Sequence, residues 1–333
     1  MIRLSVLDQS PISEGTTPQI ALQQTTTLAK EVEKLGYHRF WVSEHHFTKT
    51  LGGSSPEILI AHLASHTSKI RVGSGGVMLS HYSPYKVAEN FNLLETLYPG
   101  RIDAGMGRAP GGMPISTYAL QEGKLTNYRD YPRKLDELIA YLYDGLPESH
   151  PYKGLKATPI PEQPPKLWLL GSSGDSALLA AKRGAPFAFA QFINGDGGEN
   201  LVRQYRHAFQ PSSILDEPKT LVSIFVICAE TTEEAETIAS SLDLSLIRLE
   251  NGMPSNGTPS IETAKNYVYS PFEQIRVKEN RKRMIVGDPK QVKEKILALS
   301  EAYETDEFMI VTITYDFEHK LRSYQLLAEA FEL

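Results

Sequence analysis

The chain has 333 residues and a formal net charge of −6, with 41% hydrophobic and 22% charged residues. This composition is typical of a folded globular protein and argues against extensive disorder, and the length fits one (β/α)8 barrel with insertions. The negative charge, without a dominant basic patch, argues against a nucleic-acid partner, and no stretch approaches the ~20 apolar residues of a membrane span.

The cysteine content and the first residues bear on location. Cys228 is the only cysteine, so no disulfide can form within the chain, which is typical of a reducing compartment. The first seven residues lack the long apolar region of a secretory signal. We therefore expect a cytoplasmic protein.

Short apolar runs of strand character alternate with helical patterns along the chain, which is the order that gives a parallel sheet. Eight strands are predicted, at residues 2–7, 39–43, 70–75, 101–107, 166–171, 187–192, 221–229 and 308–314. Helical spacing of apolar residues is clear at 21–35, 87–98, 292–303 and 321–331. This order predicts a closed α/β TIM barrel, (β/α)8, as a single domain over residues 1–333.

Two connections exceed ordinary loop length, residues 109–126 after strand four and residues 250–286 after strand seven. Long connections of this kind are often lids. The second contains Asn-Gly pairs and prolines, and we expect a loop that closes over the site and excludes water. It carries a basic cluster near its end, made of Arg276, Lys278, Arg281, Lys282 and Arg283. We predict a solvated helix face there, with phosphate binding as the alternative.

The second predicted strand ends in polar residues, in the sequence FWVSEHHF at 40–47. Catalytic groups of α/β barrels lie at the C-terminal ends of the strands. Side chains alternate along a strand, so only one of His45 and His46 can face the central cavity. A metal site is not predicted, because no third zinc ligand is apparent. A structural, hydrogen-bonded histidine is the alternative to a catalytic one.

Glycines follow the third predicted strand. Gly75 and Gly76 interrupt a run of strand character, and paired glycines there mark a place where a ligand such as a flat ring can approach the backbone. A tight packing point in the barrel is the alternative. Trp41, Phe189 and Phe192 are candidates for lining an apolar pocket nearby, although barrel packing explains them equally well.

Phosphate contacts are predicted after the fourth and fifth strands. Arg108 follows Gly107 at a strand end, where a guanidinium can hold a phosphate, while the glycine spacing does not match a dinucleotide-binding turn. Ser172, Ser173 and Ser176 open an alanine-rich helix, and helix N-termini bind anions. Simple N-capping is the alternative for any one serine. Together, the loops after the second, third, fourth and fifth predicted strands favour a flat, phosphate-bearing cofactor. FMN has both of these properties.

The chain resembles the bacterial luciferase-like flavin-dependent monooxygenase family. The resemblance is densest in residues 40–47, in GSSP at 53–56, IRVGSGG at 70–76 and YPGRID at 98–103, and it resumes at 171–184. It implies a barrel that uses reduced FMN, as a cosubstrate, and O2 to oxidise a small organic substrate. It also implies a separate flavin reductase, since no nicotinamide-binding domain is visible, and a homodimer through helices at about 56–68 and 84–97.

The same resemblance implies roles for particular residues. His45 matches an acid/base group near the flavin, and an ordinary histidine pKa of about 6.5 suits proton transfer in both directions. The cofactor-binding residues that it implies are Gly75 and Gly76 against the ring, joined by a cis peptide bond, Gly107 and Arg108 near the ring and phosphate, and Ser173 and Ser176 on the phosphate with Ser172 beside them. His46 is expected to act through stability.

Departures from the family pattern argue against light emission. Light-emitting members carry a cysteine where Gly107 stands, a glutamate where Ser172 stands and a histidine where Ser83 stands. Two alternatives to an FMN-dependent monooxygenase follow. One is an F420-dependent oxidoreductase of the same barrel family, and the other is a flavin-binding protein without turnover, against which the retained His45 argues.

Overall fold

The computed structural model describes residues 2–124 and 128–333. The strands are β1 (Arg3–Asp8), β2 (Arg39–Val42), β3 (Arg71–Ser74), β4 (Val77–Met78), β5 (Ile102–Gly107), β6 (Lys166–Gly171), β7 (Phe187–Ala190), β8 (Thr220–Cys228), β9 (Met284–Gly287) and β10 (Glu307–Val311). The α-helices are α1 (Pro18–Lys34), α2 (Pro56–His66), α3 (Pro84–Leu97), α4 (Pro114–Leu120), α5 (Tyr131–Ile139), α6 (Gly174–Lys182), α7 (Gly198–Ala208), α8 (Thr232–Glu250), α9 (Ile261–Asn266), α10 (Pro271–Arg281), α11 (Pro289–Tyr303) and α12 (Phe317–Phe331). Shorter helical turns are η1 (Leu79–His81), η2 (Tyr128–Asp130) and η3 (Ala140–Asp144).

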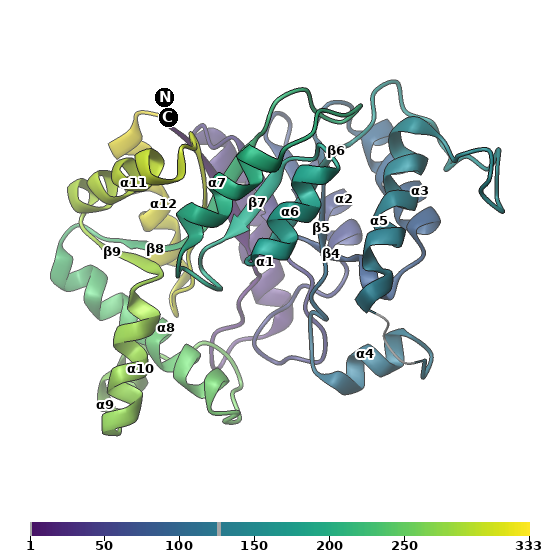
Figure 1. Ribbon diagram of the computed structural model, residues 1–333. Helices are drawn as coiled ribbons and strands as arrows, with labels where there is room; N and C mark the ends of the chain where they lie inside the picture. Colours follow the sequence, from purple (N-terminus) through teal and green to yellow (C-terminus); the bar gives the residue numbers. More distant parts are fainter. Residues whose placement is uncertain (1, 125–127) are drawn as a thin grey trace.

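Eight parallel strands close into a barrel in the order β1, β2, β3, β5, β6, β7, β8 and β10. The barrel closes because β10 pairs with β8 on one side and with β1 on the other. These are the eight strands that the sequence predicts, and their ends lie within three residues of the predicted bounds. Helices surround the strands in Figure 1. The predicted TIM barrel is therefore confirmed.

Two short strands were not predicted. β4 pairs with the C-terminal end of β5, and β9 pairs with the second half of β8, from Phe225 to Cys228, beyond the part that pairs with β7. With two residues, β4 is too short to show a periodic pattern, and β9 begins within the segment interpreted as the second long connection. Both extend the barrel wall at its C-terminal end.

The insertion at 250–286 is not the loop that we expected, because it contains α9, α10 and the start of β9. The prolines and serines there begin helices. Pro271 occupies the first turn of α10, where a missing N–H is harmless, and Ser270 forms a capping box with Glu273. The other insertion, 109–126, contains α4, and its last two residues lie outside the described residues.

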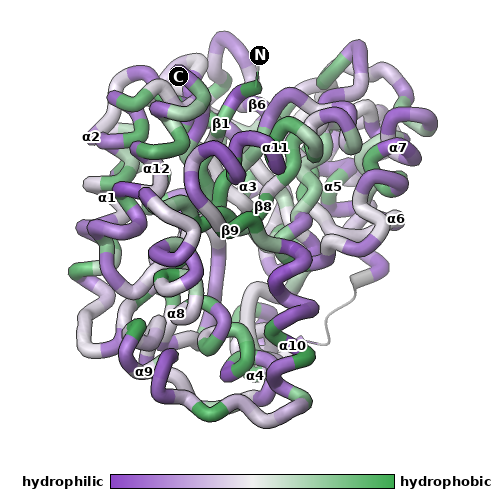
Figure 2. The backbone as a smooth tube through the Cα atoms, turned by 90° about the vertical axis from the view of Figure 1, so that its left-hand side faces the viewer, coloured by the Kyte–Doolittle hydropathy of each residue, from purple (hydrophilic) through white to green (hydrophobic). Residues whose placement is uncertain are grey.

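The apolar side chains form two layers. Outward-facing residues such as Val6, Phe40 and Val42 pack against the helices, whereas inward-facing residues such as Leu7 and Trp41 fill the barrel. Figure 2 shows the hydrophobic colour at β8 and β9 in the middle of the molecule and a hydrophilic α10 outside. No helix in the described ranges combines the length and apolarity that a bilayer crossing requires.

The N-terminal end of the barrel is closed by a buried ion network. The guanidinium of Arg39 lies 2.6 Å from Asp103 Oδ2 and 2.5 Å from Glu307 Oε1, with both carboxylates fully buried. Arg71 also pairs with Asp103, at 2.6 Å. Burial opposes ionisation, but the two arginines hold the pKa of Asp103 below its usual value. The barrel is thus a packed core at this end, so a ligand site must lie at the C-terminal rim.

Candidate functional site

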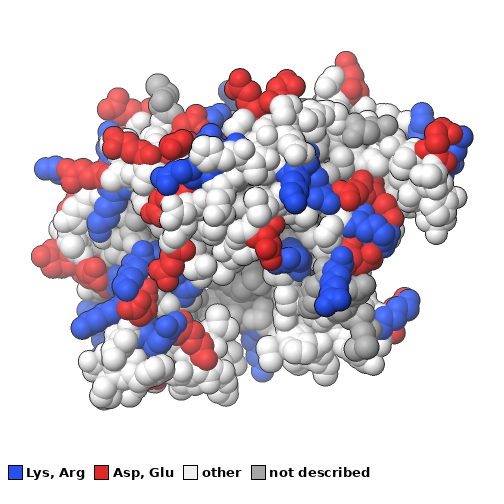
Figure 3. Space-filling view, in the orientation of Figure 1, with Lys and Arg blue, Asp and Glu red and all other residues white. Residues whose placement is uncertain are grey.

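The predicted site residues gather at the C-terminal rim of the barrel, at the ends of neighbouring strands. His45 follows β2, Gly75 follows β3, Gly107 ends β5, and Ser172 follows β6. β2 is paired with β3 and β5 with β6, so these ends lie side by side. In Figure 1 this rim is at the lower edge, with α4 to one side and α9 and α10 to the other. Figure 3 shows a hollow between these two parts.

Glu44 locks the end of β2 in place. Its fully buried carboxylate accepts hydrogen bonds through Oε1 from Tyr82 Oη, at 2.7 Å, and through Oε2 from Met78 N, at 2.8 Å. The same Oε1 lies 2.7 Å from His46 Nε2. The backbone N–H of His46 donates to Gly111 O at 2.7 Å. Glu44 and His46 therefore join β2 to β4 and to the insertion after β5.

His45 differs from its neighbour because its imidazole is unbound. Its backbone N–H donates to Gly53 O at 2.8 Å, but its buried Nε2 has no hydrogen-bond partner in the part of the chain that the structure describes. Burial, together with the nearby His46, lowers the pKa of His45 to about 4. The sequence argument used an ordinary pKa, and that expectation is wrong for the ligand-free protein. At neutral pH this imidazole is a base and not an acid.

Gly75 and Gly76 are joined by a cis peptide bond, as the resemblance implies. A Cβ on Gly75 would lie 2.7 Å from Leu7 Cδ1, and one on Gly76 would lie 2.8 Å from Gly105 O. Packing against a fixed backbone oxygen therefore requires glycine at position 76, whereas at Gly75 the close atom is the end of the Leu7 side chain, which can move. A Cβ on Gly107 would likewise lie 2.9 Å from Met78 Cε. Contact of these glycines with a ring stays a prediction.

The phosphate side of the predicted site is open. Arg108 is exposed, and its guanidinium makes no hydrogen bond or ion pair with any residue of 2–124 or 128–333. Ser173 occupies the N-cap of α6 without a side-chain capping bond, and its Oγ lies 3.3 Å from Ser176 Oγ. The N-capping alternative thus does not explain Ser173. The strand register, which pairs Met106 with Leu169, places Arg108 beside this helix start, so the group fits a phosphate.

Two of the three predicted pocket aromatics are packed in the core, although the Trp41 ring lies directly beside Gly75. Phe189 is fully buried in the helix-facing layer, with its ring centre 5.8 Å from that of Tyr303. Trp41 is fully buried inside the barrel, and its Nε1 donates to Asp103 at 2.9 Å. These two do not line a pocket at the rim. Phe192 is half-buried against Phe225, with ring centres 5.3 Å apart.

The basic cluster near the end of the second insertion is paired with acidic side chains. Arg276 bonds Glu250 at 3.0 Å, and Arg281 bonds Asp243 at 2.7 Å. Lys282, the residue after α10, pairs with Glu279 at 2.7 Å. These pairs tie α10 to α8, and the phosphate-binding alternative for this cluster finds no support.

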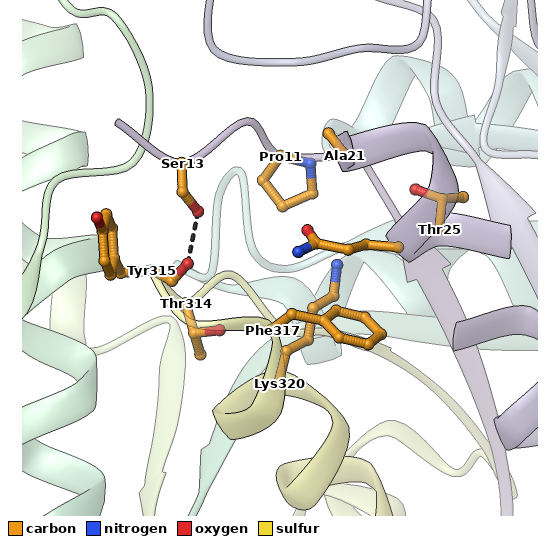
Figure 4. A pocket seen from close by; sticks show the side chains of 9 residues that line it. Pro11, Ser13, Ala21, Thr25, Thr314, Tyr315, Phe317 and Lys320 are labelled. Atoms are coloured by element: carbon orange, nitrogen blue, oxygen red, sulfur yellow. Dashed lines mark hydrogen bonds between the residues drawn. The ribbon is translucent and has the colours of Figure 1, made fainter. Parts of the chain in front are cut away.

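Two hollows away from the predicted residues do not suit a cofactor. The cavity in Figure 4, between the ends of β1 and β10, has a volume of about 10 Å³, which is water-sized. Ser13 Oγ donates to Tyr315 O there at 2.5 Å, and the buried Lys320 pairs with Asp8. A hollow of about 420 Å³ beside Thr220 lies at the opposite end of the barrel.

Sequence reasoning missed the part that Glu44 plays. The signal was present, since a carboxylate between a buried strand and two histidines is costly to bury without partners. Its partners Met78 and Tyr82 could not be identified, because they come from a later turn of the fold. Within the described ranges, no three His, Cys, Asp or Glu side chains are grouped so as to hold a metal ion.

Comparison with known proteins gives relatives along the full length. The chain is 58% identical to the uncharacterized protein YwcH of Bacillus subtilis, over 99% of each chain. It is 43% identical to an N-acetyl-S-alkylcysteine monooxygenase of the same organism, over 99% of this chain and 98% of that one. The crystal structure of apo-MsnO8 superposes with a TM-score of 0.91 at 39% identity, covering 100% of this chain and 99% of the other.

More distant structures share the fold alone. An FMN complex of a Baeyer-Villiger monooxygenase component from Pseudomonas putida matches with a TM-score of 0.71 at 19% identity, and an F420-dependent secondary alcohol dehydrogenase matches with 0.67 at 16%. The fold therefore accommodates either cofactor. The model of one family, described as luciferase-like monooxygenase, matches residues 2–305. With the relatives above, this match shows that the chain belongs to the luciferase-like monooxygenase family.

Proposed function

We propose that this protein is an FMN-dependent monooxygenase that uses reduced FMN and O2 to oxidise a small organic substrate. The observation that carries the proposal is the grouping, at one rim of the barrel, of two glycines, an uncapped helix N-terminus, and an imidazole and an arginine that bond no side chain of the described residues. Reduced FMN, when bound, supplies the electrons that activate oxygen. The chain's own residues hold the cofactor, keep water out and move a proton.

The binding residues divide by the part of the cofactor that they meet. Ser173, Ser176 and the first amides of α6 hold the phosphate, with Ser172 beside them and the charge of Arg108 opposite. Gly75 and Gly76 let the ring approach the backbone, and Gly107 leaves space at the end of β5. α4 and α10, on the two sides of the rim, limit the access of water.

His45 is the catalytic residue of this proposal. Because burial keeps its imidazole neutral at pH 7, Nε2 accepts a proton during turnover and returns it afterwards. Glu44 and His46 hold this segment in position by bonds that leave the His45 ring free. The free Nε2 argues against a non-catalytic flavin-binding protein, because an unpaired buried nitrogen is costly.

The substrate class and the setting of the reaction rest on relatives and surface features. A relative 43% identical carries the name N-acetyl-S-alkylcysteine monooxygenase, so alkyl thioethers are the first substrates to assay. Light-emitting members carry other residues at the positions of Gly107, Ser172 and Ser83. For this reason we propose that the oxidation proceeds without light. A separate reductase supplies the flavin, and we place the reaction in the cytoplasm.

A homodimer through α2 and α3 is part of the proposal. These helices expose large apolar side chains, with Ile58, Leu93 and Leu97 at 73%, 49% and 57% exposure. Exposed apolar groups on adjacent helices mark protein contact surfaces. α2 and α3 contact each other, so their outer faces form one surface.

Oxygen consumption tests the proposed function against its alternatives. The protein is mixed either with reduced FMN and O2 or with oxidised F420, which can accept a hydride, each with and without a thioether such as an N-acetyl-S-alkylcysteine. The proposal expects oxygen uptake and an oxygenated product when reduced FMN and the thioether are both present, and neither when F420 replaces FMN. Substrate oxidation with F420 and no oxygen uptake would favour the dehydrogenase, and tight FMN binding without turnover on any thioether tested would favour the non-catalytic protein.

A further inference from the structure

A buried serine at the rim lacks a hydrogen-bond partner. Ser43 directly follows β2, is 4% exposed, and its Oγ bonds no atom of the described residues. Serines in the neighbouring strands are satisfied. Ser5 Oγ donates to Glu307 at 2.9 Å, and Ser74 Oγ donates to Gly105 O at 2.8 Å. The unpaired hydroxyl is therefore a particular feature of the end of β2.

The strand geometry places this side chain on the inner side of the barrel. Phe40 and Val42 belong to the helix-facing layer, and Trp41 between them belongs to the interior. Carrying the alternation one residue further puts Ser43 on the side of Trp41, at the rim. The register pairs Val42 with Ser74, so Ser43 lies across from Gly75, at the strand spacing of about 4.8 Å.

The energetic cost indicates a missing partner. Burying a hydroxyl without a hydrogen bond destabilises the protein, a cost that alanine at the same position would avoid. Two residues further on, His45 Nε2 is also buried and unpaired. Two unsatisfied polar atoms beside a pair of glycines match a flat ligand that carries hydrogen-bonding atoms on its edge. A serine hydroxyl reaches such a ligand by rotation about χ1, without backbone movement.

We infer that the Ser43 hydroxyl makes a hydrogen bond to a polar atom of the flavin ring itself. This inference rests on the proposed function and adds a ring contact to the phosphate contacts of Arg108, Ser173 and Ser176. Because riboflavin has the same ring and no phosphate, the contact strengthens the binding of FMN and riboflavin equally. It also perturbs the electronic spectrum of the bound ring, which a purely structural serine does not touch.

The experiment compares Ser43→Ala with a matched control, Ser241→Ala. Ser241 in α8 is also fully buried, its Oγ has no partner among the described residues, and it belongs to a helix that carries none of the predicted site residues. Both variants remove an unsatisfied hydroxyl, so both are expected to keep or raise the melting temperature. Dissociation constants for oxidised FMN and riboflavin, and the visible spectrum of each complex, are then measured.

Ser43→Ala is expected to weaken FMN and riboflavin by the same factor, about 3- to 10-fold for one lost hydrogen bond, and to shift the flavin absorption band. Ser241→Ala is expected to change neither. Ser43→Cys, a weaker donor of similar size, is expected to give an intermediate loss of flavin affinity. It replaces the alanine variant in the test if that variant does not fold.

Unchanged affinity and spectrum in Ser43→Ala, or a loss confined to FMN, would overturn the inference and leave the proposed function standing. If the unaltered protein binds neither flavin in the oxidised or the reduced form, both fail.

Discussion

At the residue scale, three adjacent side chains have different tasks. Glu44 bonds Met78 and His46, whereas His45 Nε2 has no partner among the residues that the structure describes. The sequence could predict that the two histidines differ, because strand alternation separates neighbours. It could not predict the lowered pKa of His45, since burial depends on segments far away in the chain.

Replacement of His45 by alanine is expected to lower coupled substrate oxidation by ~100-fold or more, because proton transfer by a positioned base is lost. Flavin affinity should change little, since the phosphate contacts remain. Product formation per oxygen consumed is the measurement. Coupled turnover equal to that of the unaltered protein would remove His45 from the mechanism.

The low pKa of His45 also makes stability depend on pH. Its pKa is about 4 when folded and about 6.5 when unfolded, so between these values the unfolded chain binds more protons. The free energy of unfolding therefore falls as the pH drops from about 7 towards 4, by of order 1 kcal/mol per unit for each such group. His38, with a pKa of about 4 from burial and the nearby Arg39, adds to the same slope.

Urea unfolding at several pH values measures this slope. His45→Asn and His38→Asn are each expected to flatten it, and only the first to impair turnover. A slope unchanged by His45→Asn would contradict the burial of this imidazole.

The phosphate contacts give a prediction that separates two ligands. Arg108→Ala, and separately Ser173→Ala combined with Ser176→Ala, should weaken FMN by tenfold or more through the loss of charge-assisted or helix-terminus contacts. Riboflavin lacks the phosphate, so its affinity should stay the same. Equal losses for both ligands in a fluorescence titration would contradict the assignment of the phosphate site.

At the scale of elements, the sequence predicts the strands and helices in which apolar residues recur at a regular spacing. The eight barrel strands and the helices α1, α3, α11 and α12 have periodic apolar patterns, and all are present. β4 is too short for a pattern, β9 begins within the predicted second connection, and α9 and α10 are not apparent because prolines there indicate a loop, whereas Pro271 begins a helix. The sequence left two interpretations open for Phe189, and barrel packing is the one that the structure shows.

The outer face of α2 and α3 is expected to hold two copies together. Leu93→Glu combined with Leu97→Glu places charges in that face and should turn a dimer into a monomer in light scattering. Val268→Glu, at a residue 90% exposed beside α10, is the control and should leave the dimer intact. A protein that is monomeric from the start, or a double variant that stays dimeric, would contradict this interface.

At the scale of the whole molecule, the two ends of the barrel differ in kind. The N-terminal end is filled by Arg39, Asp103 and Glu307, whose charges are paired and buried. The C-terminal end carries unpaired groups, among them His45 Nε2 and Ser43 Oγ, beside a hollow surface. A barrel that binds a ligand needs one end that stabilises the fold and another end whose polar atoms are free to bond the ligand.

A crystal structure of the FMN complex tests the placement of the site most directly. We predict the phosphate on the first turn of α6 within hydrogen-bond reach of Ser173 and Ser176, the ring against Gly75 and Gly76, and His45 Nε2 facing the ring. FMN bound elsewhere, such as at the hollow beside Thr220, or a ring far from His45, would contradict the proposed site.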